Sequence, residues 1–212
     1  PTNYNYFTAT CYRSLAPSWV DRIYNLALNG YYNDNYFMRV INSTTLKIIQ
    51  FGTNGDPAIS NRYNWNSSKL SSCGVVTPQP PDMKYELNLS NTFGTLSMST
   101  SFNDDTETTW NSTAELFINT GDNVRLDPML FVPICTIDDI GMDNLAKFPS
   151  AGELTELGGT GVSLNKLYAE GNSYISTNPH WSDMAISGAV SVSCNDSACP
   201  CYKSNNDDKR TT

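Results

Sequence analysis

Apolar and polar side chains alternate along several stretches of this chain, as they do in β-strands that are buried on one face. The stretches 83–90 and 110–118 alternate without interruption, and 93–102, 124–134 and 185–194 follow the pattern more loosely. Turn-forming residues separate these stretches at intervals of roughly 8 to 12 residues, which is typical of antiparallel β proteins. The pattern predicts a mainly β fold, an antiparallel β-sandwich of about seven to nine strands.

The alternation also predicts which side chains of 110–118 face the core. The inward positions are Trp110, Ala114, Leu116 and Ile118, and the outward positions are Asn111, Thr113, Glu115 and Phe117. A β-hairpin is predicted over 35–51, with Asn42, Ser43 and Thr44 at its tip.

Two short helices are predicted between the strands. Apolar residues recur at helical spacing in 18–30, where Ser18 is placed to cap the first turn and Gly30 to end the helix. The apolar face consists of Trp19, Val20, Ile23 and Ala27. A second helix is predicted over 136–148, with Thr136 as its cap. The expected fold is therefore a β-sandwich with one or two short helices.

The N-terminal stretch 2–12 is predicted to be a strand with aromatic residues on both faces and Cys11 at its far end. Such a strand must pair with another strand to satisfy its backbone. It either joins the sheet of its own domain or adds to the sheet of the next copy by β-strand addition. The second option makes Tyr4, Tyr6 and Phe7 the candidate subunit contacts of a filament.

Residues 1–201 are interpreted as a single disulfide-bonded domain, because a chain of 212 residues can bury a real core in one sandwich. The proline-rich segment 77–82 is the candidate internal boundary, although a surface crossing within one domain is favoured. Residues 202–212 show no apolar periodicity and are expected to form a polar tail or linker.

The charge of the chain excludes two classes of partner. A net charge of -8 and a pI of about 4.5 argue against nucleic acids and anionic membranes, because both require a basic surface. No apolar run approaches the ~18 residues that a membrane-spanning helix needs. The chain begins with Pro1 rather than Met, so Pro1 is not expected to be the translational start.

Cysteines and sequons indicate the same compartment. The six cysteines are Cys11, Cys73, Cys135, Cys194, Cys199 and Cys201. An even number of cysteines without zinc-site spacing predicts a disulfide framework, and therefore an oxidising compartment, although the pairing cannot be read from the spacing.

Five N-glycosylation sequons support secretion. Their asparagines are Asn42, Asn66, Asn88, Asn111 and Asn195. A chain this rich in Asn, Ser and Thr produces about as many sequons by chance, so their placement matters more than their number. Asn42 falls on a predicted turn, and Asn88 and Asn111 fall on the polar side of predicted strands, where a glycan has room.

The sequence carries no recognisable catalytic signature, and the chain is predicted not to be an enzyme. The single histidine, His180, accompanies no nucleophile elbow and no cysteine expected to be free. No metal or cofactor is predicted, and the acidic loops with Asp104, Asp105, Glu107 and Asp122 offer at most a weak Ca²⁺ site.

Aromatic residues in a polar loop give an alternative function. Tyr63 and Trp65 lie among asparagines, and aromatic faces stack on sugar rings while amides bind hydroxyl groups. These two residues are the candidate carbohydrate-binding site of a lectin-like or adhesive module.

The preferred hypothesis is a secreted, N-glycosylated structural protein, located outside the cell or at its surface. It would assemble with copies of itself into a fibre or coat through its N-terminal strand, so its partners would be those copies and its covalent glycans. A lectin-like module is the second hypothesis. A glycoside hydrolase is the third, because paired carboxylates leave no linear motif.

Overall fold

Six antiparallel strands form one sheet in the computed structural model, which describes residues 6–63, 89–102, 110–129, 131–149, 152–177 and 185–186. The strand order in the sheet is β1-β7-β5-β6-β4-β3. The strands are β1 (Ala9–Cys11), β3 (Arg39–Asn42), β4 (Lys47–Phe51), β5 (Thr95–Phe102), β6 (Trp110–Asn119) and β7 (Pro133–Ile137). A separate pair is formed by β2 (Asn35–Tyr36) and β8 (Ala185–Ile186). The prediction of a mainly β, antiparallel fold is confirmed.

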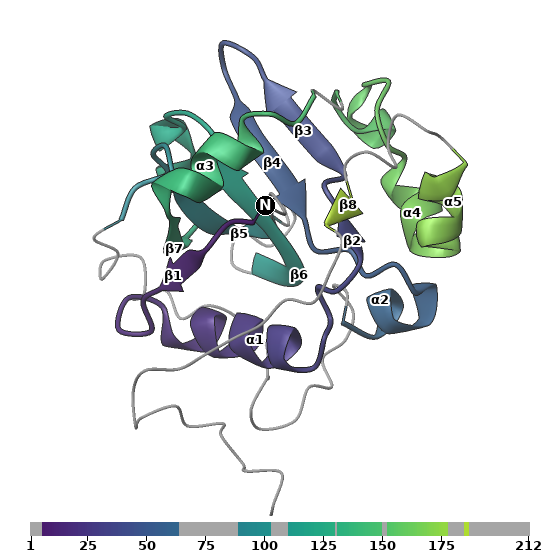
Figure 1. Cartoon of the computed structure of the whole chain (residues 1–212), viewed down its shortest axis with the longest axis horizontal. Helices are drawn as coiled ribbons and strands as arrows, with labels where there is room; N and C mark the ends of the chain where they lie inside the picture. The colour runs from purple at the N-terminus through teal and green to yellow at the C-terminus, as the bar shows by residue number, and fades with distance from the viewer. Residues whose placement is uncertain are drawn as a thin grey trace, which may run out of the picture.

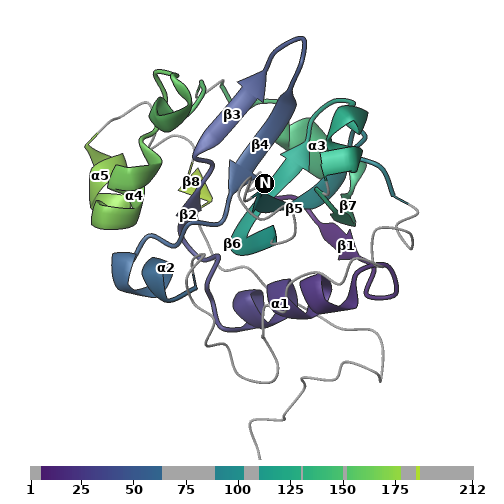
Figure 2. The same ribbon diagram turned by 180° about the vertical axis from the view of Figure 1, so that it is seen from behind.

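Helices lie at the ends and at one side of this sheet. They are α1 (Pro17–Leu28), α2 (Pro57–Tyr63), α3 (Asp139–Leu145), α4 (Leu164–Glu170) and α5 (Asn172–Ser176), with 3₁₀ turns η2 (Val124–Met129) and η3 (Thr155–Leu157). Figure 1 shows α1 below the sheet, α3 above it, and α4 and α5 beside β2 and β8. The view from behind in Figure 2 shows the same arrangement.

The main hydrophobic core lies between the inner face of the sheet and helices α1 and α3. Strand β6 contributes Ala114, Leu116 and Ile118 to this cluster, as the alternation predicts. Helices α1 and α3 contribute Trp19 and Leu145, among others. We call the face of the sheet that carries these β6 residues the inner face and the opposite face the outer face.

Both predicted helices are present, but their caps differ from the prediction. Helix α1 begins one residue before Ser18, because Pro17 occupies its first turn and Ala16 is the N-cap residue without a side-chain hydrogen bond. Proline is well suited to this position, since its missing N–H has no partner there in any helix. Helix α3 is capped by Asp138, which accepts a hydrogen bond from the Gly141 N–H, whereas Thr136 belongs to β7.

The predicted strand over 124–134 is wrong over most of its length and coincides with a strand only at residues 133–134. Residues 124–129 form the 3₁₀ turn η2, which contains Pro128, and the strand β7 begins only at Pro133. The Asp127 carboxylate accepts hydrogen bonds from the Ser90 hydroxyl and from the Asn91 backbone N–H. These bonds hold the segment as a turn and prevent it from pairing as a strand.

The hairpin of β3 and β4 is present with a longer loop than predicted. Asn42 pairs with Lys47, so the loop comprises residues 43–46. Ser43 closes this loop, because its backbone N–H donates to the Leu46 carbonyl (2.9 Å) and its hydroxyl oxygen accepts from the Leu46 N–H (3.0 Å).

The N-terminal strand joins the sheet of its own chain. Strand β1 pairs with β7 in antiparallel register, and Cys11 lies opposite Cys135. These two cysteines form a disulfide, which fixes the edge strand to its neighbour. The alternative in which the strand inserts into its own sheet is therefore the one that the structure shows for residues 9–11.

Several predicted features lie outside the described residues. These are Tyr4, Trp65, Asn66, Cys73, the segment 77–82, most of the predicted strand 83–90 including Asn88, Asp104, Asp105, Glu107, His180, Cys194, Asn195, Cys199, Cys201 and the tail 202–212. Within the ranges that the structure does describe, no helix combines the length and the apolar character needed to cross a bilayer.

Replacing both Cys11 and Cys135 by serine is expected to lower the free energy of unfolding by about 2–4 kcal/mol, because the crosslink restricts the unfolded chain. Urea unfolding monitored by circular dichroism measures the change. The control is Thr10→Ala, which removes an exposed side chain from the same strand. Equal stability of the double variant and this control would show that the disulfide does not stabilise the fold.

Candidate functional site

The outer face of β3, β4 and β6 carries polar and apolar side chains in adjacent rows. Antiparallel pairing sets Arg39 of β3 opposite Gln50 of β4. Side chains two residues apart lie on the same face of a strand, so Ile41 and Ile48 form the next row. On β6 the same spacing places Glu115 and Phe117 on the outer face.

The polar row is a continuous hydrogen-bond chain across three strands. Arg39 Nη1 donates to Gln50 Oε1 at 3.2 Å, and Gln50 Nε2 donates to Glu115 Oε2 at 2.9 Å. Glu115 also accepts from the Thr53 hydroxyl at 3.2 Å and from the Tyr168 hydroxyl. Each side chain in this hydrogen-bonded row therefore fixes the orientation of its neighbour.

The apolar row forms a second cluster on the outer face. Its buried members are Ile48, Phe117 and Leu126, and Ile41, Leu46 and Phe131 pack against them while keeping part of their surface exposed. The rings of Phe117 and Phe131 meet edge to face, with centroids 5.7 Å apart. Phe117 faces outward as predicted, but it is only 3% exposed because Leu126 and Phe131 cover it. The expectation of a solvated outer face on β6 is wrong at this point.

A network of buried amides holds Leu126 and Phe131 over this cluster. Asn91 Nδ2 donates to the Phe131 carbonyl (2.7 Å) and to Asp127 Oδ1 (2.8 Å), which fixes both ends of the covering segment. Asn119 on β6 donates to Asn91 Oδ1 at 3.1 Å. Asn91 and Asn119 are fully buried, so these hydrogen bonds are costly to break.

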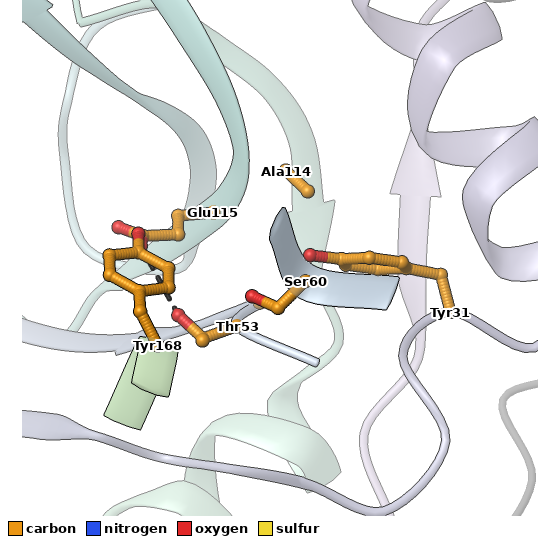
Figure 3. A pocket seen from close by; sticks show the side chains of 7 residues that line it. Tyr31, Thr53, Ser60, Ala114, Glu115 and Tyr168 are labelled. Atoms are coloured by element: carbon orange, nitrogen blue, oxygen red, sulfur yellow. Dashed lines mark hydrogen bonds between the residues drawn. The ribbon is translucent and has the colours of Figure 1, made fainter. Parts of the chain in front are cut away.

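A narrow recess lies behind the polar row (Figure 3). Its volume is about 140 Å³ including space open to solvent, and it is too narrow to hold a water molecule. Thr53 and Tyr168 point toward Glu115, whereas the hydroxyl of Tyr31 points toward Ser60 (Figure 3). The approach of β4 to β6 requires glycine at position 52, because its φ is +111° and a Cβ there would lie 2.6 Å from the Ala114 carbonyl oxygen.

The environment of Glu115 changes its acidity. Burial raises the pKa of Glu115, because the charged form loses its hydration. The hydrogen bonds from Tyr168, Gln50 and Thr53 and the positive charge of Arg39 favour the charged form and oppose this rise in pKa. Glu115 is 3% exposed and is therefore a buried acid held by donors, with no access of its own to a substrate.

The outer face can bind a small apolar group next to a fixed guanidinium. The half-exposed edge of the apolar cluster supplies the contact surface, and Arg39, which Gln50 helps to orient, supplies hydrogen-bond donors in the adjacent row. Within the described ranges, no three His, Cys, Asp or Glu side chains gather in a way that could hold a metal ion. The arrangement suits binding and polarisation of a neutral group.

The site residues predicted from sequence do not gather at this face. Tyr6 is exposed and Phe7 packs against the main core near Phe51, at the N-terminal edge of the sheet. Tyr63 is half-buried and its ring lies edge to face with Tyr31. Asn42 is exposed at the end of β3, where a glycan has room, and its glycosylation stays a prediction.

The remaining predictions have different outcomes. Asn111 lies in β6, and nothing further is established about its side chain. Of the six cysteines, Cys11 and Cys135 are joined, and the rest of the disulfide framework stays a prediction. Asp122 accepts a hydrogen bond from the Phe93 N–H, which gives it a structural partner in a turn.

Sequence reasoning missed the polar row entirely. Arg39 and Gln50 were part of a predicted hairpin and carried no motif. Arg39 and Gln50 could have been identified as a pair, because a charged residue and an amide that lie opposite each other in a hairpin have their side chains on the same face of the sheet. This identification depends on the register, which the sequence did not settle.

The fold is an antiparallel β-sheet enclosed by end helices, with a polar row and an apolar cluster side by side on its outer face. The sequence matches the family described as "Cyclophilin type peptidyl-prolyl cis-trans isomerase/CLD" over residues 2–153, and the chain belongs to this family.

Solved cyclophilin structures resemble the chain at a distance. A cyclophilin of Cryptosporidium parvum is 20% identical with a TM-score of 0.47, covering 68% of this chain and 79% of that one. The same protein in the presence of the dipeptide Ala-Pro gives 20% identity and a TM-score of 0.45 over 68% and 80% of the two chains. The Mimivirus cyclophilin is 18% identical with a TM-score of 0.45 over 69% and 74%. No curated protein matches the sequence.

Family membership corrects the hypotheses about function. The filament or coat protomer, the lectin-like module and the glycoside hydrolase are all contradicted, and so is the prediction that the chain is not an enzyme, since the family is one of isomerases. The physical reason is that prolyl isomerisation only rotates a peptide bond. It needs no nucleophile, metal or acid–base pair, so the missing catalytic motifs carried no information about it.

Replacing Glu115 by glutamine is expected to change how stability depends on pH. A carboxyl group whose pKa in the folded state lies above its ordinary value of 4.5 binds more protons folded than unfolded, so stability falls as the pH rises from about 4.5 to the raised pKa. The slope for one group is at most about 1.4 kcal/mol per pH unit. Unfolding free energies of Glu115→Gln, measured by urea titration between pH 4 and pH 8, should lack this slope.

The control for the glutamine variant is Glu170→Gln, which changes an exposed carboxylate on α4 and should keep the wild-type slope. An unchanged slope in Glu115→Gln would mean that Glu115 is not the group responsible.

Proposed function

We propose that this chain is a peptidyl-prolyl cis-trans isomerase that binds an X–Pro segment of a peptide on the outer face of β3, β4 and β6. Membership of the cyclophilin family supports the reaction class. The observation that carries the assignment of the site is the position of Arg39, whose guanidinium lies in the row next to the apolar cluster.

The reaction requires stabilisation of a twisted peptide bond. The bond between residue X and proline has partial double-bond character, and the barrier to its rotation is about 18–20 kcal/mol. In the twisted state the resonance is lost and the prolyl nitrogen regains a lone pair that can accept a hydrogen bond. A catalyst accelerates the rotation if it binds this twisted state more strongly than either planar isomer.

Arg39 has the chemistry to favour the twisted state. Its guanidinium stays protonated and donates hydrogen bonds without accepting any. Placed at the prolyl nitrogen, it would gain its strongest hydrogen bond when the peptide bond is twisted. Gln50 occupies one Nη1 hydrogen and thereby limits the rotation of the group. A donor that is already oriented needs little rearrangement during the reaction.

The apolar cluster has the chemistry to hold the prolyl ring. Ile48, Phe117 and Leu126 form its floor, and Phe131 and Leu46 form its partly exposed edge. A proline side chain carries no polar atom, so its contact with this edge would bury apolar surface on both partners. Apolar surroundings also weaken the hydration of the planar amide, which favours its rotation.

We also infer that the six-stranded sheet is curved as in a cyclophilin barrel, in place of the predicted sandwich. The support is that β4, β5, β6 and β7 all contribute inward side chains to one cluster with α1 and α3. Secretion, N-glycosylation at Asn42 and a disulfide framework beyond Cys11 and Cys135 stay separate proposals, supported by the composition of the chain.

Replacing Arg39 by alanine is expected to lower kcat/KM for a chromogenic prolyl peptide at least about a hundredfold, because an oriented donor to the transition state is removed. Arg39→Lys should recover only a small part, since an ammonium lacks the planar fork. The control is Arg13→Ala, which removes an arginine that is paired with Asp21 away from the site. Full activity in Arg39→Ala would refute the assignment of the site.

Replacing Phe131 by alanine is expected to raise KM several-fold, with a smaller change in kcat, because part of the surface for the prolyl ring is lost. Steady-state kinetics with the same peptide separate the two parameters. Phe93→Ala is the matched control, because Phe93 is 60% exposed and belongs to no described cluster. A KM that changes equally in both variants would place the prolyl ring elsewhere.

A further inference from the structure

The Arg39 guanidinium has a second partner that does not come from the sheet. Glu153 faces it with both carboxylate oxygens, because Arg39 Nε lies 2.5 Å from Oε1 and Nη2 donates to Oε2 at 2.6 Å. The side chains are 15% and 31% exposed, so the pair is partly shielded from water. The hydrogen bond at Nη2 and the close charge contact at Nε hold the guanidinium against the carboxylate.

Glu153 is itself held in place by its own segment. The residue before it, Gly152, forms an isolated β-bridge with Val40, the neighbour of Arg39 on β3. Glu153 Oε1 accepts a hydrogen bond from the Leu154 N–H at 2.8 Å, and the Glu153 carbonyl accepts from the Gly161 N–H at 2.8 Å. Contacts within its own segment therefore orient the Glu153 carboxylate independently of its contact with Arg39.

The turn that returns to Glu153 requires a glycine. A Cβ at Gly159 would lie 2.1 Å from the Glu153 carbonyl oxygen, so no other residue fits there without a shift of the backbone. Gly158 ends η3 in the left-handed conformation (φ +80°), which glycine adopts without strain. The sequence thus allows the chain to pass close behind Glu153.

Residues 152–177 form a supporting unit with a hydrophobic cluster of its own. Met38, next to Arg39, packs in this cluster with Leu154, Val162, Leu167 and Ile175. Two further contacts attach the unit to β6 and to the loop after β4: Tyr168 donates to Glu115, and the Asn172 N–H donates to the Gly55 carbonyl at 2.9 Å. Figure 1 shows α4 and α5 of this unit beside β2, near the hairpin of β3 and β4. The family match ends at residue 153, so nearly all of this unit lies beyond the matched segment.

The geometry leaves part of the guanidinium available to a peptide. A guanidinium has five N–H groups. Glu153 faces Nε and Nη2, and Gln50 accepts from Nη1. One N–H on each terminal nitrogen therefore remains for a further acceptor, and its direction is fixed by the two partners.

We propose that Glu153 is a positioning residue for Arg39, which holds the guanidinium in the orientation that meets the prolyl nitrogen, with residues 152–177 as its rigid support. The inference rests on the proposed isomerase function. A carboxylate that blocked Arg39 would have to leave when substrate binds. The contacts through Gly152, Leu154 and Gly161 hold Glu153 where it is, so it orients the arginine and stays in place during turnover.

The test compares Glu153→Gln with wild type in steady-state kinetics and in ¹⁵N–¹H NMR of the arginine Nε–H groups. The glutamine keeps the size of the side chain and loses the charge. We expect kcat to fall about ten- to a hundredfold with KM nearly unchanged, as for a misplaced catalytic group. In an Arg39→Ala background the same substitution should change kcat less than about twofold, because the two residues act as one unit.

Two variants serve as controls. Asp21→Asn breaks the other arginine–carboxylate pair of the described residues, between Asp21 and Arg13, and should keep wild-type kinetics. Glu153→Asp retains the charge on a shorter side chain and should recover part of kcat. A merely structural role for Glu153 would lower the melting temperature without this recovery and without the kcat-specific loss.

The outcomes separate this inference from the proposed function. Unchanged or increased kcat in Glu153→Gln would overturn the positioning role, and an increase would mean that Glu153 competes with the substrate. If wild type itself failed to isomerise prolyl peptides, the proposed function would fall. The Arg39 Nε–H signal then tests the contact between Glu153 and Arg39 independently of activity. A shift of this signal in Glu153→Gln supports the contact, and identical spectra refute it.

Discussion

The pairing of β3 with β4 is the constraint on which the site depends. One register places Arg39 opposite Gln50 and Ile41 opposite Ile48, so a donor row and an apolar row lie next to each other on the outer face. On β6, Phe117 lies opposite Gln50 but packs with Ile48, and Glu115 accepts a hydrogen bond from Gln50. A shift by one residue would turn each of these side chains to the opposite face. The catalytic chemistry that we propose therefore follows from backbone hydrogen bonds formed elsewhere in the hairpin.

The rest of the molecule supports this face from both sides. On the inner face, Leu116 and Ile118 are buried in one core with residues of α1 and α3, and this packing stabilises the sheet. On the outer face the buried amides of Asn91 and Asn119 hold the covering segment over the apolar cluster. Arg39 is held by Gln50 within the sheet and by Glu153 from outside it. These contacts fix the orientation of Arg39, as the proposed prolyl isomerisation requires, since this reaction needs an oriented hydrogen-bond donor and no nucleophile.

The sequence predicted the elements better than the site. Alternation identified β6 and its buried side, because that signal is local. Two failures had the same cause, which is information held at a distance. The hairpin tip was placed at 42–44, a register that would set Arg39 opposite Lys47, whereas the loop is 43–46 and sets it opposite Gln50. The stretch 124–134 reads as a strand, but Asn91, far away in sequence, holds Asp127 in a turn. The absence of a catalytic motif misled the prediction of function, because rotation of a peptide bond leaves no such motif.

The central claim is that the outer face of β3, β4 and β6 binds an X–Pro segment and speeds its isomerisation. Two-dimensional NMR exchange spectroscopy of a short prolyl peptide with substoichiometric protein tests both parts in one sample. The account predicts cis–trans exchange cross-peaks that the peptide alone does not show, together with amide shifts confined to β3, β4, β6 and the segment after η2. Absence of exchange, or shifts confined to other parts of the protein, would contradict it.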